Sequence, residues 1–415
     1  MTKIENQNSG GILFICNIQN GRYVMSNIIV NENYLSKDNL QIYIKEFVTS
    51  GVVETDNNFI PAIIISHGFG GNCSENDDYC EFFAHHGYAA YCFDFCGGSR
   101  KGEGKSSGCT IDMNVWTECD DLMAVLTYVK TRKYVNCHNI TLMGTSQGGF
   151  VSGLTAAKCD DGIKNLIMIC PALCIPDDAR RGHLGGADYD VSDVPDEIIC
   201  PNGMVIGKQF HETVAGLDPF LELARYGGNV LLIQGMLDAT VNYSYAVKAA
   251  NHYKKGKCQL KLIRSAGHSF SESLQNSIKV TSLSFLEGKK EILTIQVFIM
   301  NKEVLKQSDN YKETAVYFTG YCDNEYFKGT ILPGAKDVQT QTGDGTVVPR
   351  AEYILSGTDY EGNICQINIV NERKGDFFRP RITTDSPALY YLNNTELTAA
   401  LEEFENGLTV RIFKS

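Results

Sequence analysis

One serine lies in a motif whose residue types and spacing suit nucleophilic chemistry. Residues 144–148 read G-T-S-Q-G, with Ser146 at the centre. The apolar run at 139–143 predicts a buried strand before the motif, and a helix is expected from Gln147 to about residue 158. A serine between a strand and a helix, flanked by glycines, is typical of a nucleophile elbow, in which a tight turn exposes the hydroxyl. The sequence therefore predicts Ser146 as a nucleophile.

A glycine-rich turn upstream suits the oxyanion that such a nucleophile creates. Residues 61–66 predict a buried strand, and residues 67–71 read H-G-F-G-G. We expect the backbone N–H groups of Phe69 and Gln147 to form an oxyanion hole, because the residue after the nucleophile and a turn of this kind each supply one donor. The alternative, a phosphate-binding loop, is disfavoured because the chain has no G-x-x-x-x-G-K-[ST] motif. His67 is interpreted as a structural residue beside the turn.

Two further polar residues follow predicted strands. Asp238 lies on the loop after the apolar run 229–235, and His268 lies on the loop after the run 259–264. A histidine can act as general base when an acid orients it. The alternative role for Asp238 is to cap the helix that follows. The order Ser–Asp–His is that of α/β-hydrolases, and it differs from the orders in chymotrypsin and subtilisin. We predict a triad of Ser146, Asp238 and His268.

The elements that must hold these residues alternate along the chain. Residues 11–60 predict antiparallel strands at a sheet edge, at 14–18, 23–25 and 40–44. From residue 61 onwards strands alternate with helices, which predicts a mostly parallel, doubly wound sheet. The expected fold class is therefore α/β, an α/β-hydrolase catalytic domain over residues 1–290.

A long irregular stretch interrupts this alternation at residues 171–228. A connection of that length inside a compact domain is usually functional, so we expect a lid insertion over Ser146, with a weak helix near 207–215. Its candidate substrate contacts are Asp177, Asp178, Arg180 and Tyr189, and the alternative for each is a solvated lid residue. The polar, glycine-rich loop at 94–106 is interpreted as structural.

The pattern changes near residue 290. Residues 291–415 predict an all-β barrel domain of unknown role, in which no triad or metal constellation is visible. A short helical segment is expected at 395–405. The expected strands are 293–300, 314–322, 325–332, 346–356, 363–371 and 408–414.

Composition excludes several classes of partner. The formal net charge of −12 disfavours nucleic acid and anionic membranes, and no apolar stretch approaches the ~20 residues of a membrane helix. The 15 cysteines include no C-x-x-C pair, so we expect buried thiols in the cytoplasm, with neither a metal site nor a disulfide framework. The N-terminal residues lack the apolar core of a signal peptide. No cofactor is expected, and exposed barrel edges allow a homodimer.

Residues 61–287 resemble the feruloyl (cinnamoyl) esterases of intestinal and rumen bacteria. The resemblance implies the same triad and oxyanion hole, and a lid that grips an aromatic acyl group. Asp178 matches an acidic residue that binds the phenolic end in that family. Phe210 stands where a lid tyrosine is common and is therefore a further candidate substrate-binding residue. The matching segments are 67–69, 93–95, 126–130, 146–149, 235–241 and 266–268.

The C-terminal residues resemble a different family. Residues 292–415 are similar to a small bacterial β-barrel family of unknown function, so this resemblance implies no activity. The matching segments are 327–334, 343–345, 350–353 and 390–393.

Three functions follow from these patterns. The first is a serine carboxylesterase acting on small esters of aromatic, including hydroxycinnamic, acids. The second is an enzyme that uses the same triad to cleave another kind of bond, as in a C–C hydrolase, a thioesterase or a peptidase. A peptidase usually carries a large propeller or cap domain upstream. The third is a non-catalytic binding or assembly protein, which has no need of a complete triad.

Overall fold

The structure is a computed structural model that describes residues 16–19, 22–25, 28–53, 59–159, 161–375 and 377–414. The chain divides into two compact units, residues 1–262 and 263–415. The division falls before the domain boundary expected at 290/291. As a result, the segment 263–290 groups with the C-terminal residues.

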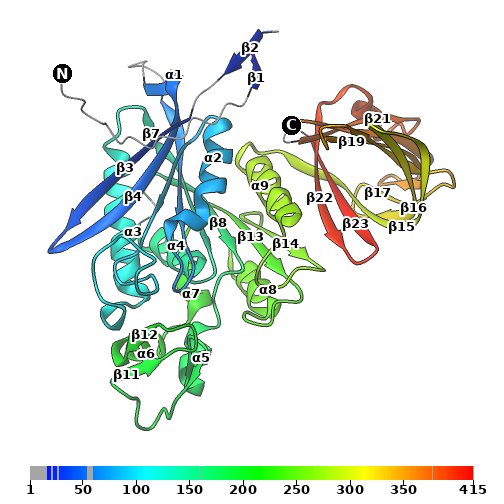
Figure 1. The fold of residues 1–415 in the computed structure, drawn as a ribbon. Helices are drawn as coiled ribbons and strands as arrows, with labels where there is room; N and C mark the ends of the chain where they lie inside the picture. The colour runs from blue at the N-terminus through cyan, green and yellow to red at the C-terminus, as the bar shows by residue number, and fades with distance from the viewer. Residues whose placement is uncertain are drawn as a thin grey trace, which may run out of the picture. The chain divides into compact units, whose positions relative to one another are not determined.

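An eight-stranded sheet is the centre of the first unit (Figure 1). The pairs β5–β6, β5–β7, β7–β8 and β8–β13 are parallel, whereas β3–β4 and β4–β6 are antiparallel. The predicted mostly parallel sheet is therefore confirmed. In sheet order, the strands are β14 (Cys258–Ile263), β13 (Asn229–Gly235), β8 (Ile163–Ile169), β7 (Val135–Thr145), β5 (Ile60–Ser66), β6 (Ala89–Phe93), β4 (Leu40–Thr49) and β3 (Ile28–Lys37).

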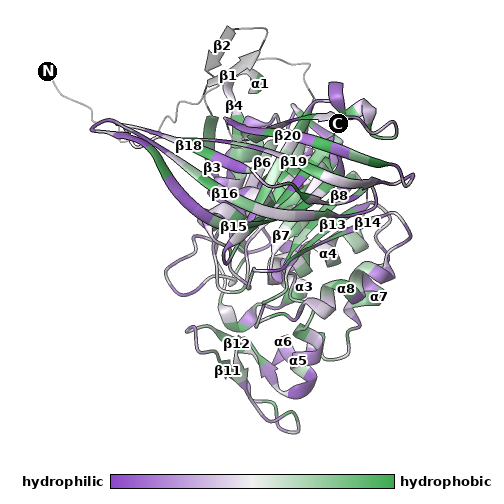
Figure 2. Cartoon of the chain, turned by 90° about the vertical axis from the view of Figure 1, so that its right-hand side faces the viewer, coloured by the Kyte–Doolittle hydropathy of each residue, from purple (hydrophilic) through white to green (hydrophobic). Residues whose placement is uncertain are grey.

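The inner strands of this sheet are apolar along almost their whole length, as their green colour in Figure 2 shows. Strands that are covered on both faces have this composition, because neither face meets water. Tyr91 of β6 joins a core with α3 (Val115–Lys130) and α4 (Gln147–Lys158). The next residue, Cys92, points to the other face, where its thiol lies 3.7 Å from Asp77 of α2 (Asp77–His85). The sheet therefore has helices on both faces.

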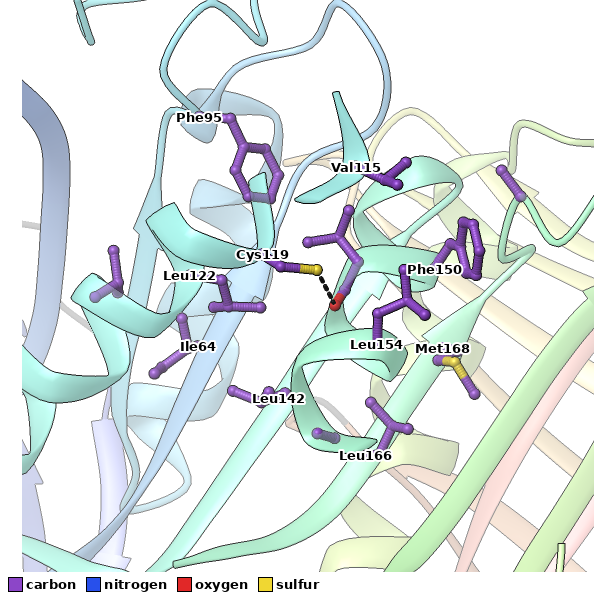
Figure 3. Packing of buried hydrophobic residues seen from close by; sticks show 14 of the residues in the cluster. Ile64, Phe95, Val115, Cys119, Leu122, Leu142, Phe150, Leu154, Leu166 and Met168 are labelled. Atoms are coloured by element: carbon purple, nitrogen blue, oxygen red, sulfur yellow. Dashed lines mark hydrogen bonds between the residues drawn. The ribbon is translucent and has the colours of Figure 1, made fainter. Parts of the chain in front are cut away.

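Close packing fixes the two helices that flank the motif serine. Figure 3 shows residues of α3 and α4 interleaved with sheet residues such as Leu142 and Leu166. The buried Cys119 thiol of α3 also donates a hydrogen bond to the Val151 carbonyl of α4, at 3.7 Å.

The N-terminal strands behave differently from the expectation. β3 and β4 lie at the sheet edge, as predicted for residues 40–44. However, β1 (Cys16–Gln19) and β2 (Arg22–Met25) form a separate two-stranded sheet. Residues 14 and 15 of the first expected strand lie outside the described residues.

The segment 171–228 consists of short elements, and α6 confirms the expected weak helix. Two small hairpins pair β9 with β10 and β11 with β12. The elements are α5 (Ile175–Arg181), β9 (His183–Leu184), β10 (Ala187–Asp188), β11 (Glu197–Ile199), β12 (Val205–Gly207), α6 (Lys208–Val214) and α7 (Pro219–Leu223). The remaining helices of the first unit are α1 (Ser50–Val53), η1 (Cys73–Asn76), η2 (Thr110–Asp112) and α8 (Tyr243–His252).

The second unit is a helix followed by an antiparallel sheet of nine strands. Along β20, exposed and buried residues alternate, which gives the alternating bands visible in Figure 2. β15 also pairs with β16, which closes the sheet into the predicted barrel. The elements are α9 (Glu272–Leu286), β15 (Lys290–Ser308), β16 (Tyr311–Asp323), β17 (Phe327–Ile331), β18 (Lys336–Thr342), β19 (Val347–Asp359), β20 (Ile364–Lys374), β21 (Phe377–Thr384), η3 (Tyr390–Asn394), β22 (Leu397–Phe404) and β23 (Gly407–Lys414).

The prediction of a short helical segment at 395–405 is wrong. Residues 397–404 form β22, which pairs in continuous antiparallel register with β23. The stretch is rich in Ala, Leu and Glu, which favour helix, but a strand ladder with buried side chains outweighs that weak preference.

The long strand β15 keeps one open edge. It pairs with β23 over residues 290–298 and with β16 over residues 295–308, so its last residues have a strand neighbour on one side only. A homodimer stays a prediction. Among the described helices, none has both the length and the apolar character that crossing a membrane requires.

Candidate active site

Ser146 lies at the turn between β7 and α4, as predicted. Its backbone has φ 56° and ψ −122°, a conformation that a non-glycine residue adopts only when its surroundings enforce it. Its N–H donates to the Ile169 carbonyl of β8 at 2.9 Å, and its carbonyl accepts from the Ala172 N–H at 3.0 Å. These bonds hold the strained residue in place.

Close backbone packing explains the glycines of the motif. A Cβ atom added at Gly148 would lie 2.2 Å from the His67 carbonyl oxygen, and one at Gly144 would lie 2.3 Å from the Gly148 oxygen. No side chain fits in either place. The elbow therefore packs directly against the backbone at the end of β5.

The turn after β5 lies beside the serine. Gly68 is so close that a Cβ there would meet the Ser146 Cβ at 3.3 Å. The Gly71 N–H donates to the Gly68 carbonyl at 3.0 Å, and Gly70 has φ +73°, which identifies a type II turn with Phe69 as its second residue. Type II turns need glycine at this third position, so the sequence G-F-G-G suits the turn.

Two backbone N–H groups flank Ser146 without a protein acceptor. Within the part of the chain that the structure describes, neither the Phe69 N–H nor the Gln147 N–H donates a hydrogen bond. Gln147 is the first residue of α4, where N–H groups have no partner inside the helix. Both are the groups expected for the oxyanion hole.

His67 and the loop 94–106 support this turn. The His67 ring is buried, its Nε2 accepts from the Phe95 N–H at 3.1 Å, and its Nδ1 lies 2.8 Å from the Gly68 carbonyl. Burial lowers the pKa of His67, so the ring is neutral and structural at physiological pH. The loop contributes too, because Gly70 donates to the Gly98 carbonyl at 3.0 Å.

Asp238 follows β13 and is buried in a network of donors. Its Oδ1 accepts from the N–H groups of Thr240 at 2.9 Å and Val241 at 2.8 Å. Its Oδ2 accepts from the Gln234 amide at 2.9 Å. Asn242 caps α8 instead, with its side chain accepting from the Ser244 N–H, so Asp238 is not the cap. A carboxylate fixed in this way is rigid enough to orient a base.

Cys170 adds a contact that the sequence did not indicate. It follows β8 with φ 43°, and its N–H donates to the Ile233 carbonyl at 2.8 Å. Its thiol lies within 4.8 Å of an Asp238 carboxylate oxygen. Burial, together with the charge of Asp238, raises the pKa of the thiol to about 12. The thiol is therefore neutral. A cysteine inside an apolar run gave no signal beyond burial.

Glu118 is a second residue that the sequence reading missed. Its carboxyl lies on the inward face of α3, 1% exposed, and accepts from the Gln147 side-chain amide at 2.8 Å. Burial raises the pKa of Glu118 to about 8, although the Gln147 hydrogen bond opposes that shift. The only available signal was an acidic residue next to Cys119, within a stretch that contains many apolar residues. The hydrogen bond fixes the side chain of Gln147.

His268 lies near the start of the second unit, on the loop between β14 and α9. Its side chain is half-buried. β14 is the sheet neighbour of β13, the strand that precedes Asp238. Ser271 caps α9 three residues later, since its hydroxyl accepts from the Leu274 N–H.

The segment 171–228 reaches the turn after β5. A Cβ atom at Gly185 would lie 3.1 Å from the Phe69 ring, and one at Gly70 would lie 3.3 Å from Met204. The Thr110 hydroxyl of η2 donates to the Val205 carbonyl at 2.5 Å, which ties the segment to the unit. Residues 171–228 therefore pack over the turn.

The predicted substrate contacts have protein partners of their own. Asp178 forms an ion pair with Arg181. Arg180 pairs with Asp177 and also donates to the carbonyls of Ala215 at 2.7 Å and Leu217 at 3.3 Å.

The two aromatic candidates for substrate contact in the segment 171–228 differ in exposure. Phe210 is 2% exposed and belongs to the hydrophobic core. The Tyr189 hydroxyl lies 2.8 Å from His211 Nδ1, and Tyr189 itself is only half-buried.

Known structures repeat the architecture of the first unit. Est1E from Butyrivibrio proteoclasticus, with ferulic acid bound, is 27% identical, covers 61% of this chain and 98% of its own, and has a TM-score of 0.55. The chain has the α/β-hydrolase fold. A second structure of Est1E is 26% identical over 62% of this chain and 98% of its own, with a TM-score of 0.53.

More distant comparisons agree on the fold. The α/β-hydrolase GrgF from Penicillium sp. sh18 is 18% identical over 63% of this chain and 98% of its own, with a TM-score of 0.50. Residues 59–184 match the family described as serine aminopeptidase, S33. No curated protein matched the chain. Together the family match and the two Est1E structures support a hydrolase, and the segment 59–184 contains Phe69, Ser146 and Gln147.

Proposed function

We propose that this chain is a serine carboxylesterase with Ser146 as nucleophile, His268 as general base and Asp238 as the acid that orients it. In this mechanism His268 takes the Ser146 proton, and the Ser146 oxygen bonds to the ester carbonyl carbon. The N–H groups of Phe69 and Gln147 hold the negative oxygen. His268 then protonates the leaving alcohol and activates water, which releases the acid and restores the serine.

The strained elbow beside two unpaired N–H groups carries this proposal. Strain at Ser146 costs free energy, and it exposes the hydroxyl where both N–H groups can meet an oxyanion. A purely structural turn has no need of either feature. Asp238 is buried and accepts hydrogen bonds from Gln234, Thr240 and Val241. This supports the role of the acid, because an orienting carboxylate must be fixed.

We further propose that the substrates are small esters of aromatic acids, hydroxycinnamoyl esters among them. Est1E, at 27% identity, is described with ferulic acid bound. In this proposal Asp178 faces the phenolic end of the acyl group, and Phe210 supports the lid from the core. Arg180 stabilises the lid by donating hydrogen bonds to two backbone carbonyls, and in this proposal it also contacts the substrate.

One observation favours a second function. The family that matches residues 59–184 is described as serine aminopeptidase, and the same three groups also cleave amides. The triad equally suits thioesters, and C–C bonds in suitable diketones. A substrate series therefore has to separate these bonds.

The test is hydrolysis of methyl ferulate, chlorogenate, short p-nitrophenyl esters, an acyl thioester and an aminoacyl amide by wild type and Ser146→Ala. We expect wild type to prefer the aromatic esters, and Ser146→Ala to lose about 10⁴-fold or more in kcat. Faster cleavage of the amide or the thioester would replace the ester proposal by that reaction. Equal rates for wild type and Ser146→Ala would contradict every function that uses the triad.

We also propose that the chain works in the reducing cytoplasm, where thiols persist. Support comes from the fourteen cysteines between residues 73 and 365, which are free thiols. Alkylation of the denatured, freshly isolated chain without reductant should then modify every cysteine. Protected pairs would contradict this location.

A further inference from the structure

β22 of the C-terminal domain is buried on both faces. Leu397 and Ala399 point into the core of the closed sheet. The alternate residues point outward, and they are covered as well, with Ala400 2% exposed and Glu402 4% exposed. An outer face of a barrel normally meets water, so something must cover this one.

The cover is α9, the helix that follows His268. Val280 of α9 forms an apolar cluster with Ala400 of β22 and Phe413 of β23. In addition, eight consecutive residues of α9, 277–284, are buried. The helix is thus held against the β22–β23 hairpin.

The same hairpin holds the other end of the histidine loop. The Ser265 hydroxyl donates to the Glu403 carbonyl of β22 at 2.7 Å. Ser265 lies three residues before His268, and α9 begins four residues after it. Both ends of the loop 264–271 are therefore attached to β22.

Buried ion pairs connect the strands of this hairpin close to these contacts. Arg411 of β23 pairs with Glu402 at 2.7 Å and with Glu291 of β15 at 3.0 Å, and all three side chains are largely buried. A buried, fully paired charge group of this kind fixes the geometry of the strands that carry it.

We propose that the C-terminal β-domain positions the general base of the active site: the β22–β23 hairpin and α9 hold the loop that carries His268, and Ser265 is a positioning residue. This inference rests on the proposed function, in which His268 is the base. It gives the β-domain a role in catalysis without a site of its own.

The first experiment compares Ser265→Ala with Ser265→Thr, which keeps the hydroxyl. The readout is the rate at which a fluorophosphonate probe labels Ser146, since the probe reports base activation whatever the natural substrate is. We expect Ser265→Ala to react about two- to tenfold more slowly, the effect of one neutral hydrogen bond, and Ser265→Thr to recover the rate. With a hydrolysed ester the loss should appear in kcat and leave KM unchanged.

The matched control is Ser269→Ala, which removes an exposed hydroxyl from the same loop. It should label at the wild-type rate. Each variant is first checked for native Trp116 fluorescence and circular dichroism, and Ser265→Cys, a weaker donor of similar size, replaces Ser265→Ala if that variant does not fold.

The outcomes separate the two proposals. Labelling of Ser265→Ala at the wild-type rate, or equal slowing of Ser265→Ala and Ser269→Ala, overturns the positioning role and leaves the esterase proposal intact. A wild-type chain whose Ser146 is not labelled at all contradicts the proposed function, and the positioning role with it.

Discussion

At the scale of single residues, the candidate site contains buried groups that contact the proposed functional residues and hold their side chains in place. Glu118 and Gln147 are 29 positions apart in the sequence, yet they form a buried hydrogen bond beside the nucleophile. Gln234 likewise donates a buried hydrogen bond to Asp238. The Cys170 thiol lies beside the same carboxylate. These residues fix the side chains of Gln147, the proposed oxyanion donor, and of Asp238, the proposed acid.

Glu118 predicts a pH dependence of stability. Because burial raises its pKa from 4.5 to about 8, the folded chain binds this proton more tightly than the unfolded chain. The free energy of unfolding therefore falls as pH rises from 4.5 to 8, by on the order of a few kcal/mol. Glu118→Gln keeps the acceptor for Gln147 and removes this contribution. Urea unfolding at pH 5.5 and pH 8, followed by the single Trp116 on the same helix, measures the difference between the two chains.

Groups other than Glu118 titrate equally in both proteins, so they cancel in that difference. We expect wild type to lose more stability than Glu118→Gln between the two pH values. An identical loss in both would show that Glu118 stays ionised in the folded chain.

At the scale of elements, the elbow depends on backbone contacts that exclude side chains. β5, β7 and α4 meet where Gly148 faces the His67 carbonyl. The type II turn after β5, whose Gly68 lies beside Ser146, and the start of α4 each carry one unpaired N–H group. The segment 171–228, in turn, packs on this turn through Gly185 and Met204.

Gly148→Ala tests the elbow. Its Cβ would lie 2.2 Å from the His67 oxygen, so the backbone must shift, and we expect a loss of stability of about 1–3 kcal/mol. We also expect labelling of Ser146 to slow by about 10²-fold or more, since displacement affects an oxyanion donor. Gly51→Ala is the control, because nothing lies within 4 Å of a Cβ at Gly51. Wild-type activity in Gly148→Ala would contradict the tight packing of the elbow.

At the scale of the whole molecule, the chain combines an α/β-hydrolase unit with an all-β domain, and the segment 263–290 links them in sequence. This segment carries His268 and α9, and it groups with the β-domain. The stability of the β-domain should then limit the activity of the hydrolase.

Arg411→Met tests this dependence. It leaves the carboxylates of Glu402 and Glu291 buried without their cation, which should cost about 3–5 kcal/mol. We expect the temperature at which ester hydrolysis is lost to fall accordingly. The combined change Arg411→Met, Glu402→Leu and Glu291→Leu removes the charges together and should recover much of that loss. If heat inactivation of the single variant is unchanged, the stability of the β-domain does not limit the activity of the hydrolase.

The sequence by itself determined the features that depend on neighbours along the chain. A strand, a glycine-flanked serine and a helix specify the elbow through local sterics, and G-F-G-G specifies its turn, so both were predictable and both were found. The alternation of strands and helices likewise predicted the parallel sheet. The triad of Ser146, Asp238 and His268 follows from loop positions in the same way, and it stays a prediction.

Only the tertiary structure decided what depends on distant partners. Residues 397–404 have helix-forming residues, yet they form β22 because β23, the barrel core and α9 bury them. The Glu118–Gln147 bond and the carbonyl acceptors of Arg180 are equally non-local. A local pattern cannot encode such contacts, because the free energy that selects them arises from burial and pairing between segments that the fold alone brings together.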